Sequence, residues 1–297
     1  MSVALLLLPD FLLIASGALL RRFRAFDAPL WTGVERLVYF VLFPALLFRS
    51  LATSPSALSD AGRLVGVGVA FSVAGMLLSL LARPLLRLPQ PVFAACFQCA
   101  FRFNTYVALA VAGRLAGERG LALISLLVGV LVPLVNLAAV GMLARGRGGR
   151  IALELARNPL VVACAAGILW RHLGWPLPIV AARFLELLAG AAVPLGLLAV
   201  GAGLTLARQT LPFPALAWWH GVKLVALPAI AFALAWLVGL SPVERQIAVV
   251  MAAVPTATSA YILAMQMNGH GAPVALLISS GTLLAALTLP LWIALVS

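Results

Sequence analysis

The chain has 297 residues, of which 64% are hydrophobic and 9% are charged, and its mean hydropathy is +1.14. Soluble domains carry about 25% charged residues, so this composition excludes an ordinary soluble protein and indicates one built for a bilayer. The formal net charge of +12 does not indicate a nucleic-acid partner, because the arginines lie between apolar runs and form no basic stripe with interleaved aromatic residues.

Apolar runs follow one another along the chain with short connections between them. Because about 20 apolar residues cross the hydrocarbon core of a bilayer, we expect ten membrane-spanning helices and an all-α polytopic membrane protein. The expected helices are 3–20, 30–52, 62–83, 91–113, 119–143, 157–174, 183–206, 213–238, 244–267 and 271–296.

The arginines predict the orientation in the membrane. Loops after odd-numbered helices carry more arginine than loops after even-numbered ones, and the positive-inside rule assigns the richer loops to the cytoplasm. We therefore expect a cytoplasmic basic loop at 145–156 and both termini outside the cytoplasmic membrane. The basic cluster Arg21–Arg24 follows the first apolar run, which favours a retained span over a cleaved signal peptide.

Short matches relate the two halves of the chain. Each match is weak in so apolar a sequence, but they occur in the same order in both halves. Two pairs lie 150 residues apart, and two later pairs lie 157 and 155 residues apart. The matched segments are Ala15–Arg21 with Ala165–Arg171, Phe43–Leu47 with Val193–Leu197, Val132–Leu134 with Leu289–Leu291, and Asn104–Tyr106 with Ser259–Tyr261.

These matches predict an inverted repeat. Each half has five helices, and an odd number of spans forces the second half into the membrane with the opposite orientation. The predicted organisation is a first repeat at 1–144, the basic loop at 145–156 and a second repeat at 157–297.

Two polar stretches interrupt apolar helices. Phe101–Tyr106 (FRFNTY) lies in the fourth helix and Val254–Tyr261 (VPTATSAY) in the ninth. An arginine at the centre of a membrane helix costs roughly 2.5–3.5 kcal/mol, so such residues usually face a cavity or a partner. Interrupted helices in corresponding positions of two halves indicate a transporter's binding site. We therefore predict that helices four and nine are broken and cross near the bilayer midplane.

The predicted crossing point suits an anion, because half-helix N-termini carry partial positive charge and free N–H donors. Pro255 lacks an N–H and accounts for the break in helix nine, whereas helix four has no central proline and its break rests on the repeat. The predicted substrate-binding residues are Arg102, Asn104, Thr105, Asn136, Pro255, Thr256, Thr258 and Ser259.

These residues also have simpler interpretations, which stay open. Asn104 can form hydrogen bonds between helices. Thr256, Thr258 and Ser259 can bond back to their own helix beside the proline. Arg102 can pair with backbone carbonyls in place of a substrate carboxylate.

None of the eight acidic residues lies at the centre of a predicted span, whereas proton relays and sodium sites usually need a buried carboxylate. Glu35 and Glu186, near equivalent starts of helices two and seven, are the candidates for coupling to H⁺ or Na⁺. Their simpler interpretation is that they cap these helices beside Arg36 and Arg183.

An enzyme is not expected. An intramembrane enzyme needs a nucleophile with a base, or metal ligands, and His172, His220 and His270 lie near span ends without partners. Cys96 and Cys99 form a C-x-x-C motif inside an apolar run, where we interpret them as small packing residues. We therefore predict no cofactor and no metal site.

Several stretches resemble the auxin efflux carrier (AEC) family, in particular a bacterial member, within the bile acid/sodium symporter-like superfamily. The resemblance covers the whole chain, with ten spans and a central basic loop. The stretches that carry it are Phe101–Tyr106 with its asparagine, Arg157–Leu160 (RNPL), Val193–Leu204 (VPLGLLAVGAGL) and Ala253–Tyr261 with its proline.

The resemblance implies a scaffold, a mobile transport unit and a substrate site where helices four and nine cross, with Asn104 on the substrate carboxylate. Family members move organic anions such as auxin or small dicarboxylates, and some work as dimers, which makes a homodimer an expected form. This chain departs from the family pattern at Val107–Ala112, where relatives have glycines and often a proline. It also has threonines and a serine where relatives tend to have an asparagine after the proline of helix nine. Both departures bear on the substrate.

The leading hypothesis is a secondary transporter, a permease or efflux carrier, that moves a small organic anion by alternating access with an elevator-like motion. The alternative is a sodium-coupled symporter of the bile-acid type. The lack of buried carboxylates counts against that alternative, although backbone carbonyls can also bind sodium.

Overall fold

The computed structural model describes residues 3–53, 61–143, 158–204, 211–267 and 270–296. Within these ranges every regular element is a helix, so the fold is all-α as expected. The basic loop predicted at 145–156 lies outside the described residues.

The helices follow the ten predicted segments closely, and several segments are divided by π or 3₁₀ turns. The first half contains α1 (Val3–Leu20), α2 (Ala28–Leu37), η1 (Val38–Leu42), α3 (Phe43–Ala52), α4 (Gly62–Leu86), α5 (Gln90–Phe97), η3 (Gln98–Ala100) and α6 (Thr105–Leu143). The second half contains α8 (Pro159–His172), α9 (Ile179–Ala202), α10 (Phe213–Gly221), η5 (Val222–Ala226), α11 (Leu227–Leu237), α12 (Pro242–Ala253), α13 (Ser259–Gln266) and α14 (Gly271–Val296).

Local sequence signals start several of these helices. The Asp27 carboxylate caps α2 by accepting a hydrogen bond from the Leu30 amide at 3.1 Å. Asn158 caps α8 in the same way through the Leu160 amide at 3.0 Å. A capping box joins Ser241 and Glu244 at the start of α12. Such caps satisfy amide groups that the first turn of a helix leaves unpaired.

The long helix α6 contains two of the predicted membrane helices. Its backbone leaves the helical region at Ala116 and Gly117, and Gly117 has a φ of 54°. Glycine occupies this left-handed region without the steric cost that a side chain adds. The kink therefore serves as the connection predicted between the fourth and fifth helices.

Length and apolar composition qualify six helical runs as membrane spans: Ala28–Ala52, Gly62–Leu86, Gln90–Leu143, Ile179–Ala202, Phe213–Leu237 and Gly271–Val296. The Gln90–Leu143 run is long enough to hold both the fourth and fifth predicted helices. Two shorter apolar helices cover Leu5–Leu20 and Pro159–His172. These runs support a multi-pass membrane protein.

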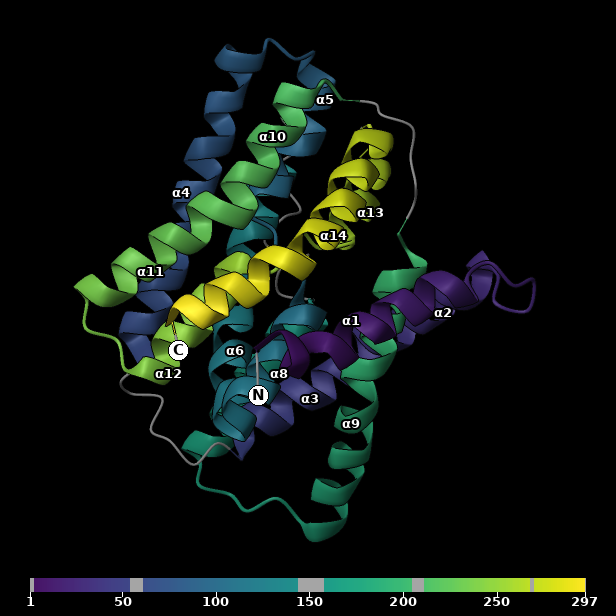
Figure 1. Ribbon diagram of the computed structural model, residues 1–297. Coiled ribbons are helices and arrows are strands. Elements are labelled where there is room, and N and C mark those ends of the chain that lie inside the picture. The colour runs from purple at the N-terminus through teal and green to yellow at the C-terminus, as the bar shows by residue number, and fades with distance from the viewer. Residues whose placement is uncertain (1–2, 54–60, 144–157, 205–210, 268–269, 297) are drawn as a thin grey trace.

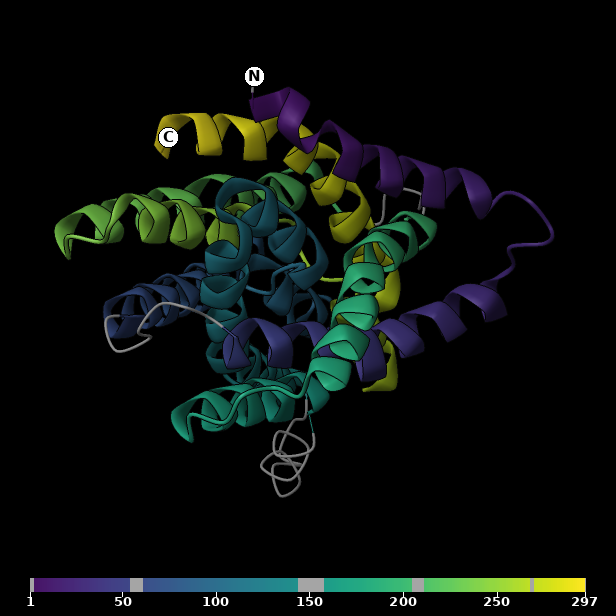
Figure 2. The same cartoon turned by 90° about the horizontal axis from the view of Figure 1, so that it is seen from below.

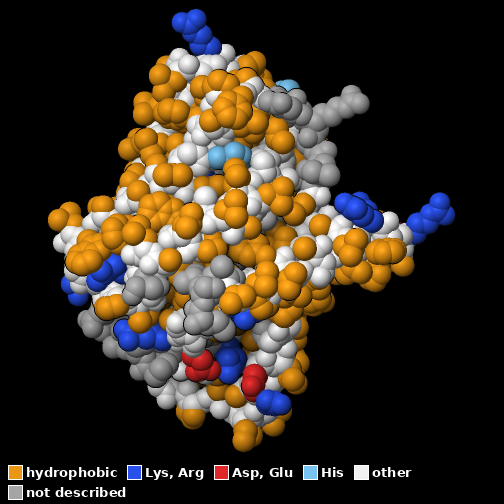
Figure 3. Space-filling model, viewed as in Figure 1, with side chains coloured by type: hydrophobic (Ala, Val, Ile, Leu, Met, Phe, Trp, Pro, Cys, Tyr) orange, Lys and Arg blue, Asp and Glu red, His pale blue; other side chains and the backbone are white. Residues whose placement is uncertain are grey.

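The outer surface agrees with a lipid environment. Large apolar side chains project outward, among them Ile179, Val180 and Leu237, which are 85%, 78% and 81% exposed. Hydrophobic side chains cover most of the face shown in Figure 3, and the charged ones gather near its margins. A monomeric soluble protein rarely exposes apolar surface on this scale, whereas lipid tails accept it.

The helices pack into two sets (Figures 1 and 2). In the first set α1 packs against α9, and α3 packs against both α8 and α9. In the second set α4 packs against α11, and α12 packs against α4, α6, α11 and α14. Helix α6 packs against both sets, because it contacts α12 of the second set and also α3, α8 and α9 of the first.

Close backbone approaches in the first set repeat at a constant sequence distance. A Cβ atom on Gly17 of α1 would collide with the carbonyl oxygen of Leu198 in α9. A Cβ atom on Gly167 of α8 would lie 2.8 Å from the carbonyl oxygen of Phe48 in α3. Each residue of the first contact has its counterpart in the second contact 150 positions away, which is the distance between the matched sequence segments.

Candidate functional site

In the first half of the chain, a helix break lies in the apolar run that contains the polar stretch Phe101–Tyr106. After α5 and the 3₁₀ turn η3, residues Phe101–Asn104 are non-helical, and the helix resumes at Thr105. Asn104 starts the new helix, because its Oδ1 accepts hydrogen bonds from the Tyr106 and Val107 amides at 3.1 and 3.3 Å. An asparagine cap, and no proline, therefore accounts locally for this break.

The second half carries a break around Pro255. Helix α12 ends at Ala253, and Val254 is extended with φ −62° and ψ 147°. This conformation is the one that a following proline imposes. The helical path resumes at Ser259 with α13.

The two breaks touch, although about 150 residues separate them in the sequence. The backbone N–H of Asn104 donates to the Pro255 carbonyl at 2.8 Å, and the Thr256 hydroxyl donates to the Cys99 carbonyl at 2.8 Å. The Gln98 amide Nε2 donates to the Ala260 carbonyl at 3.0 Å. Backbone groups that each break frees are thus satisfied by the other break. We call Cys99, Arg102, Asn104, Pro255 and Thr256 the central site.

One polar atom of the central site is unsatisfied. Asn104 is 2% exposed, and its Nδ2 atom has no hydrogen-bond partner among the described residues. A buried donor left without an acceptor costs about 1–3 kcal/mol. Native proteins keep few such groups, and those that they keep call for an explanation such as a bound ligand.

Arg102 is buried beside Asn104 and is held by neutral partners. Its Nη1 donates to Gln98 Oε1 at 2.7 Å, and its Nη2 donates to Asn136 Oδ1 at 2.6 Å. None of the ion pairs found in the described part of the chain includes Arg102. Because a guanidinium group stays protonated in proteins, the central site carries a positive charge that no carboxylate of the described residues pairs with.

The remaining predicted residues either follow the central-site residues closely in the chain or contact Arg102. Asn136 of α6 reaches it through Arg102. Thr105 is the first residue of α6, Thr258 precedes α13, and Ser259 is its first residue, and all three are half-buried. The structure therefore brings Arg102, Asn104, Pro255 and Thr256 into one cluster with the other four close to it in the chain or in contact with Arg102.

An aromatic pair connects the start of α6 to the first helix set. The Tyr106 ring lies 4.5 Å from the Phe43 ring, measured between centroids, and against Gly196 of α9. Phe43 belongs to α3, so Tyr106 links the start of α6 to both α3 and α9. Sequence reasoning did not assign a role to these aromatic residues.

Lys223 is a second buried cation that sequence reasoning left without a role. It lies in η5, is 2% exposed, and its Nζ donates to the Ala252 carbonyl at 2.8 Å. Ala252 is the last but one residue of α12, so the ammonium group sits at the end of the broken helix. An ionisable residue inside an apolar segment was the signal available for it in the sequence.

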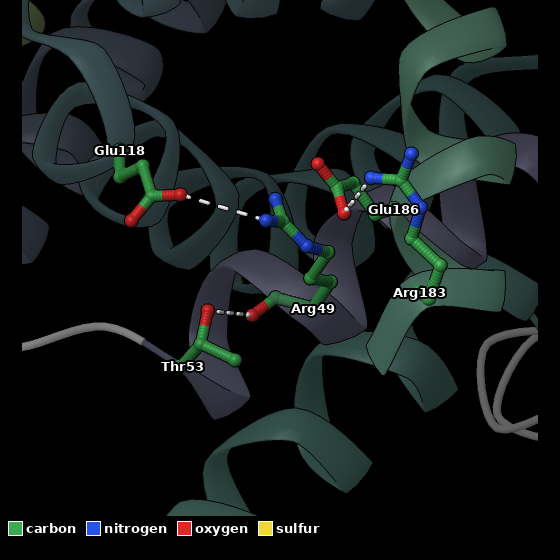
Figure 4. A network of polar contacts seen from close by, with 5 residues as sticks. All are labelled: Arg49, Thr53, Glu118, Arg183 and Glu186. Atoms are coloured by element: carbon green, nitrogen blue, oxygen red, sulfur yellow. Dashed lines mark hydrogen bonds and ion pairs between the residues drawn. The ribbon is translucent and has the colours of Figure 1, made fainter. Parts of the chain in front are cut away.

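A separate polar cluster lines a depression of about 360 Å³ at the periphery. Figure 4 shows Arg49 of α3 reaching Glu118 of α6 at 3.5 Å, and Arg183 and Glu186 of α9 paired at 2.9 Å. The Glu118 side chain is 67% exposed. Exposed pairs of this kind contribute little free energy, and here each cation already has a carboxylate. Glu186 lies beside Arg183 as expected, but the expectation that it caps its helix is wrong, because α9 begins at Ile179 and has no acidic residue in its first turn.

A third ion pair joins α1 to α6. The Arg114 Nε and Nη2 atoms donate to the two Asp10 carboxylate oxygens at 2.6 and 2.9 Å. Asp10 lies well inside α1, and its side chain is 7% exposed. The expectation that acidic residues avoid the interior of the spans therefore needs this exception, and the bidentate partner explains how the carboxylate is tolerated.

The titratable residues of the described chain offer no metal centre, because no group of three or more His, Cys, Asp or Glu side chains is close enough to hold an ion. Cys96, Cys99 and Cys164 are buried free thiols.

Residues 148–293 match the family model described as membrane transport protein. The match covers the second predicted repeat and just under half of the chain. No curated protein matches the sequence. Together with the long apolar helices, the family match supports a membrane transporter and a lipid bilayer environment.

Proposed function

We propose that this protein is a secondary transporter that moves a small organic anion across the cytoplasmic membrane and binds it at the central site. The observation that carries the proposal is the unpartnered Asn104 Nδ2 donor, buried where two broken helices touch. A ligand with an acceptor oxygen would satisfy it. The family match to membrane transport proteins supports the same class of function.

The charge balance of the central site favours an anion over a cation. Arg102 is buried with two neutral amide oxygens as its partners. The N-termini of α6 and α13 begin at the breaks, and helix N-termini carry partial positive charge. An unbalanced buried cation is costly, so an anionic ligand gains binding energy by neutralising it.

A sodium ion fits the described central site less well. Carbonyl oxygens that the breaks release are the natural ligands for sodium. Three of them already accept hydrogen bonds: Cys99 from Thr256, Pro255 from Asn104, and Ala252 from Lys223. The sodium-coupled alternative therefore has little support from this arrangement, and a proton or no coupling ion is the simpler proposal.

The proposed architecture is an inverted repeat of two five-helix halves, 1–144 and 157–297, with both termini outside. The paired contacts Gly17–Leu198 and Gly167–Phe48, each residue 150 positions from its counterpart, support it. In this proposal the set containing α1, α3, α8 and α9 is the scaffold. The set containing α4, α11, α12 and α14 moves with the central site in an elevator-like step.

The experiment that tests the function is counterflow of a panel of small carboxylates in proteoliposomes. Wild type is compared with Asn104→Ala and Arg102→Ala. The control is Asn158→Ala, which removes an asparagine cap of the same kind from α8. We expect one or more carboxylates to be transported by the wild type and the control, and both central-site variants to lose this transport.

Full transport by Asn104→Ala would refute the central site as the binding site. Equal losses in Asn104→Ala and Asn158→Ala would mean that the effect comes from helix capping. Transport that needs a sodium gradient would favour the bile-acid-type alternative.

A further inference from the structure

Lys223 is the only lysine among the 20 lysine and arginine residues of the sequence. It lies in the π-helical turn η5, between α10 and α11. The indole Nε1 of Trp292 donates to the Leu224 carbonyl of the same turn at 2.9 Å, which secures the turn against α14. Short π-helical turns inside longer helices frequently occur at functional sites.

The partner of Lys223 is a backbone carbonyl at the C-terminal end of α12. The Ala252 carbonyl lies where the chain becomes extended toward Pro255, and Lys223 Nζ supplies its hydrogen bond at 2.8 Å. The C-terminal end of a helix carries partial negative charge, which attracts a cation. An ammonium group has three donors, and one carbonyl occupies one of them.

No carboxylate neutralises Lys223 within the described residues. The elements packed against η5 are α4, α10, α11, α12, α14 and η3. Glu244 is the sole acidic residue on them, and it belongs to the capping box at the opposite end of α12. The other ionisable groups on these elements are Arg63 and Arg83 of α4, Cys99 of η3, His220 of α10, which contacts Ser280 at 2.9 Å, and Arg245 of α12.

Lys223 lies close to the central site, because the residue that it contacts is near Pro255 in the sequence. Ala252 precedes Pro255 by three residues, and the Pro255 carbonyl accepts the Asn104 amide. The element η5 also packs directly against η3, the turn before Arg102. Two buried cations, Lys223 and Arg102, therefore flank the contact between the breaks, one from each half of the chain.

We propose that Lys223 is a specificity-determining residue of the central site, where its ammonium supplies a second positive charge that a bound anion neutralises. This inference rests on the proposed function and names the residue that makes the site select anions. Gln98 and Asn136 each accept one hydrogen bond from Arg102, which has five donors, and Ala252 accepts one from Lys223, which has three, so both cations keep donors for a ligand.

The single lysine permits a direct test. Protein labelled with ¹⁵N at the lysine Nζ gives one side-chain ammonium signal in an NMR spectrum. The signal is followed while a carboxylate that the wild type transports is titrated into the protein in nanodiscs. We expect a saturable shift with the midpoint found for binding of that carboxylate, and no shift in Asn104→Ala.

Two variants distinguish the effect of the Lys223 charge from the effect of its hydrogen bond to the end of α12. Lys223→Gln keeps a donor for the Ala252 carbonyl without the charge, and Lys223→Met removes both. Arg245→Gln is the control, because it removes one charge from the other end of α12, where Arg245 stacks on Trp236 at 4.0 Å. We expect both Lys223 variants to weaken anion binding by at least about tenfold, and the control by less than about twofold.

The outcomes distinguish the two levels of the proposal. If Lys223→Gln binds the anion as the wild type does, or if the lysine signal stays still while the anion binds, Lys223 only caps α12 and the inference is wrong. If the wild type binds and transports no carboxylate of the panel, the proposed function itself is wrong.

Discussion

The central site and the peripheral depression both contain arginines, but these arginines differ in their burial and in the charge of their partners. In the depression Arg49 and Arg183 each face a glutamate, and the side chains are partly to largely exposed, from 24% for Arg49 to 68% for Arg183. Arg102 of the central site and the neighbouring Lys223 are buried and contact neutral oxygens. A buried charge without a counter-charge is costly, so it is the second arrangement that calls for a ligand. Burial and partner type, more than the number of charges, separate a candidate site from a surface cluster.

The largest expected effect is that of Asn104→Asp. The aspartate keeps an oxygen that can cap α6, but it removes the Nδ2 donor and brings a negative charge to the anion. We expect anion transport to fall by at least about 100-fold, because like charges in contact cost several kcal/mol. Counterflow in proteoliposomes measures this loss. Asn158→Asp, the same change at the α8 cap, should transport normally, and near-normal transport by Asn104→Asp would remove the distinction between the two regions.

Arg102→Met should have the next largest effect. It removes the buried charge and leaves the Gln98 and Asn136 oxygens without their donor, so we expect anion affinity to drop by about 10–100-fold. Asn136→Ala should cost less, because Asn136 acts through Arg102. In a double-mutant cycle the two changes should be strongly non-additive. Additive losses would show that Asn136 contributes independently of Arg102.

A matched pair of threonines gives a smaller contrast. Thr256→Val removes the hydroxyl that satisfies the buried Cys99 carbonyl, and Thr53→Val removes a hydroxyl that donates to the Arg49 carbonyl in the depression. We expect Thr256→Val to destabilise the protein by about 1–3 kcal/mol, because a buried acceptor is left unpaired. Thr53→Val should stay within about 0.5 kcal/mol, as surface changes usually do. Thermal unfolding in detergent compares them, and equal shifts would contradict the contrast.

Glu118→Gln should have the smallest effect. It breaks the ion pair with Arg49, but exposed pairs are worth roughly 0–1 kcal/mol. We expect thermal stability and the apparent affinity for the transported anion to remain close to those of the wild type. A large loss of anion affinity in this variant would move the candidate site from the central site to the depression.

Sequence reasoning located the break in the ninth helix from a local cause and the break in the fourth helix from the repeat, and the structure shows that both breaks have local causes. Pro255 imposes an extended residue before it, and the polar stretch around Asn104 contains its own helix cap. It also located most helix ends, since apolar runs and capping residues such as Asp27 and Asn158 are local signals. The kink in α6 follows the same logic, because a glycine stands where the backbone needs a positive φ.

Sequence reasoning could not predict which residues contact one another across the molecule. Lys223 meets Ala252, Asp10 meets Arg114, and Tyr106 meets Phe43 at sequence distances where no local rule applies. Asn104 was assigned to the site, but nothing in the sequence distinguishes its satisfied oxygen from its unsatisfied Nδ2 atom.

By itself the sequence determined the all-helical membrane class, the approximate helices and the two breaks, because hydrophobicity and capping act over a few residues. Only the tertiary structure decided that the Asn104 amide meets the Pro255 carbonyl, and that Lys223 and Arg102 lie buried without carboxylate partners in the described chain. Long-range packing makes these choices, since each depends on which surfaces of distant helices fit together.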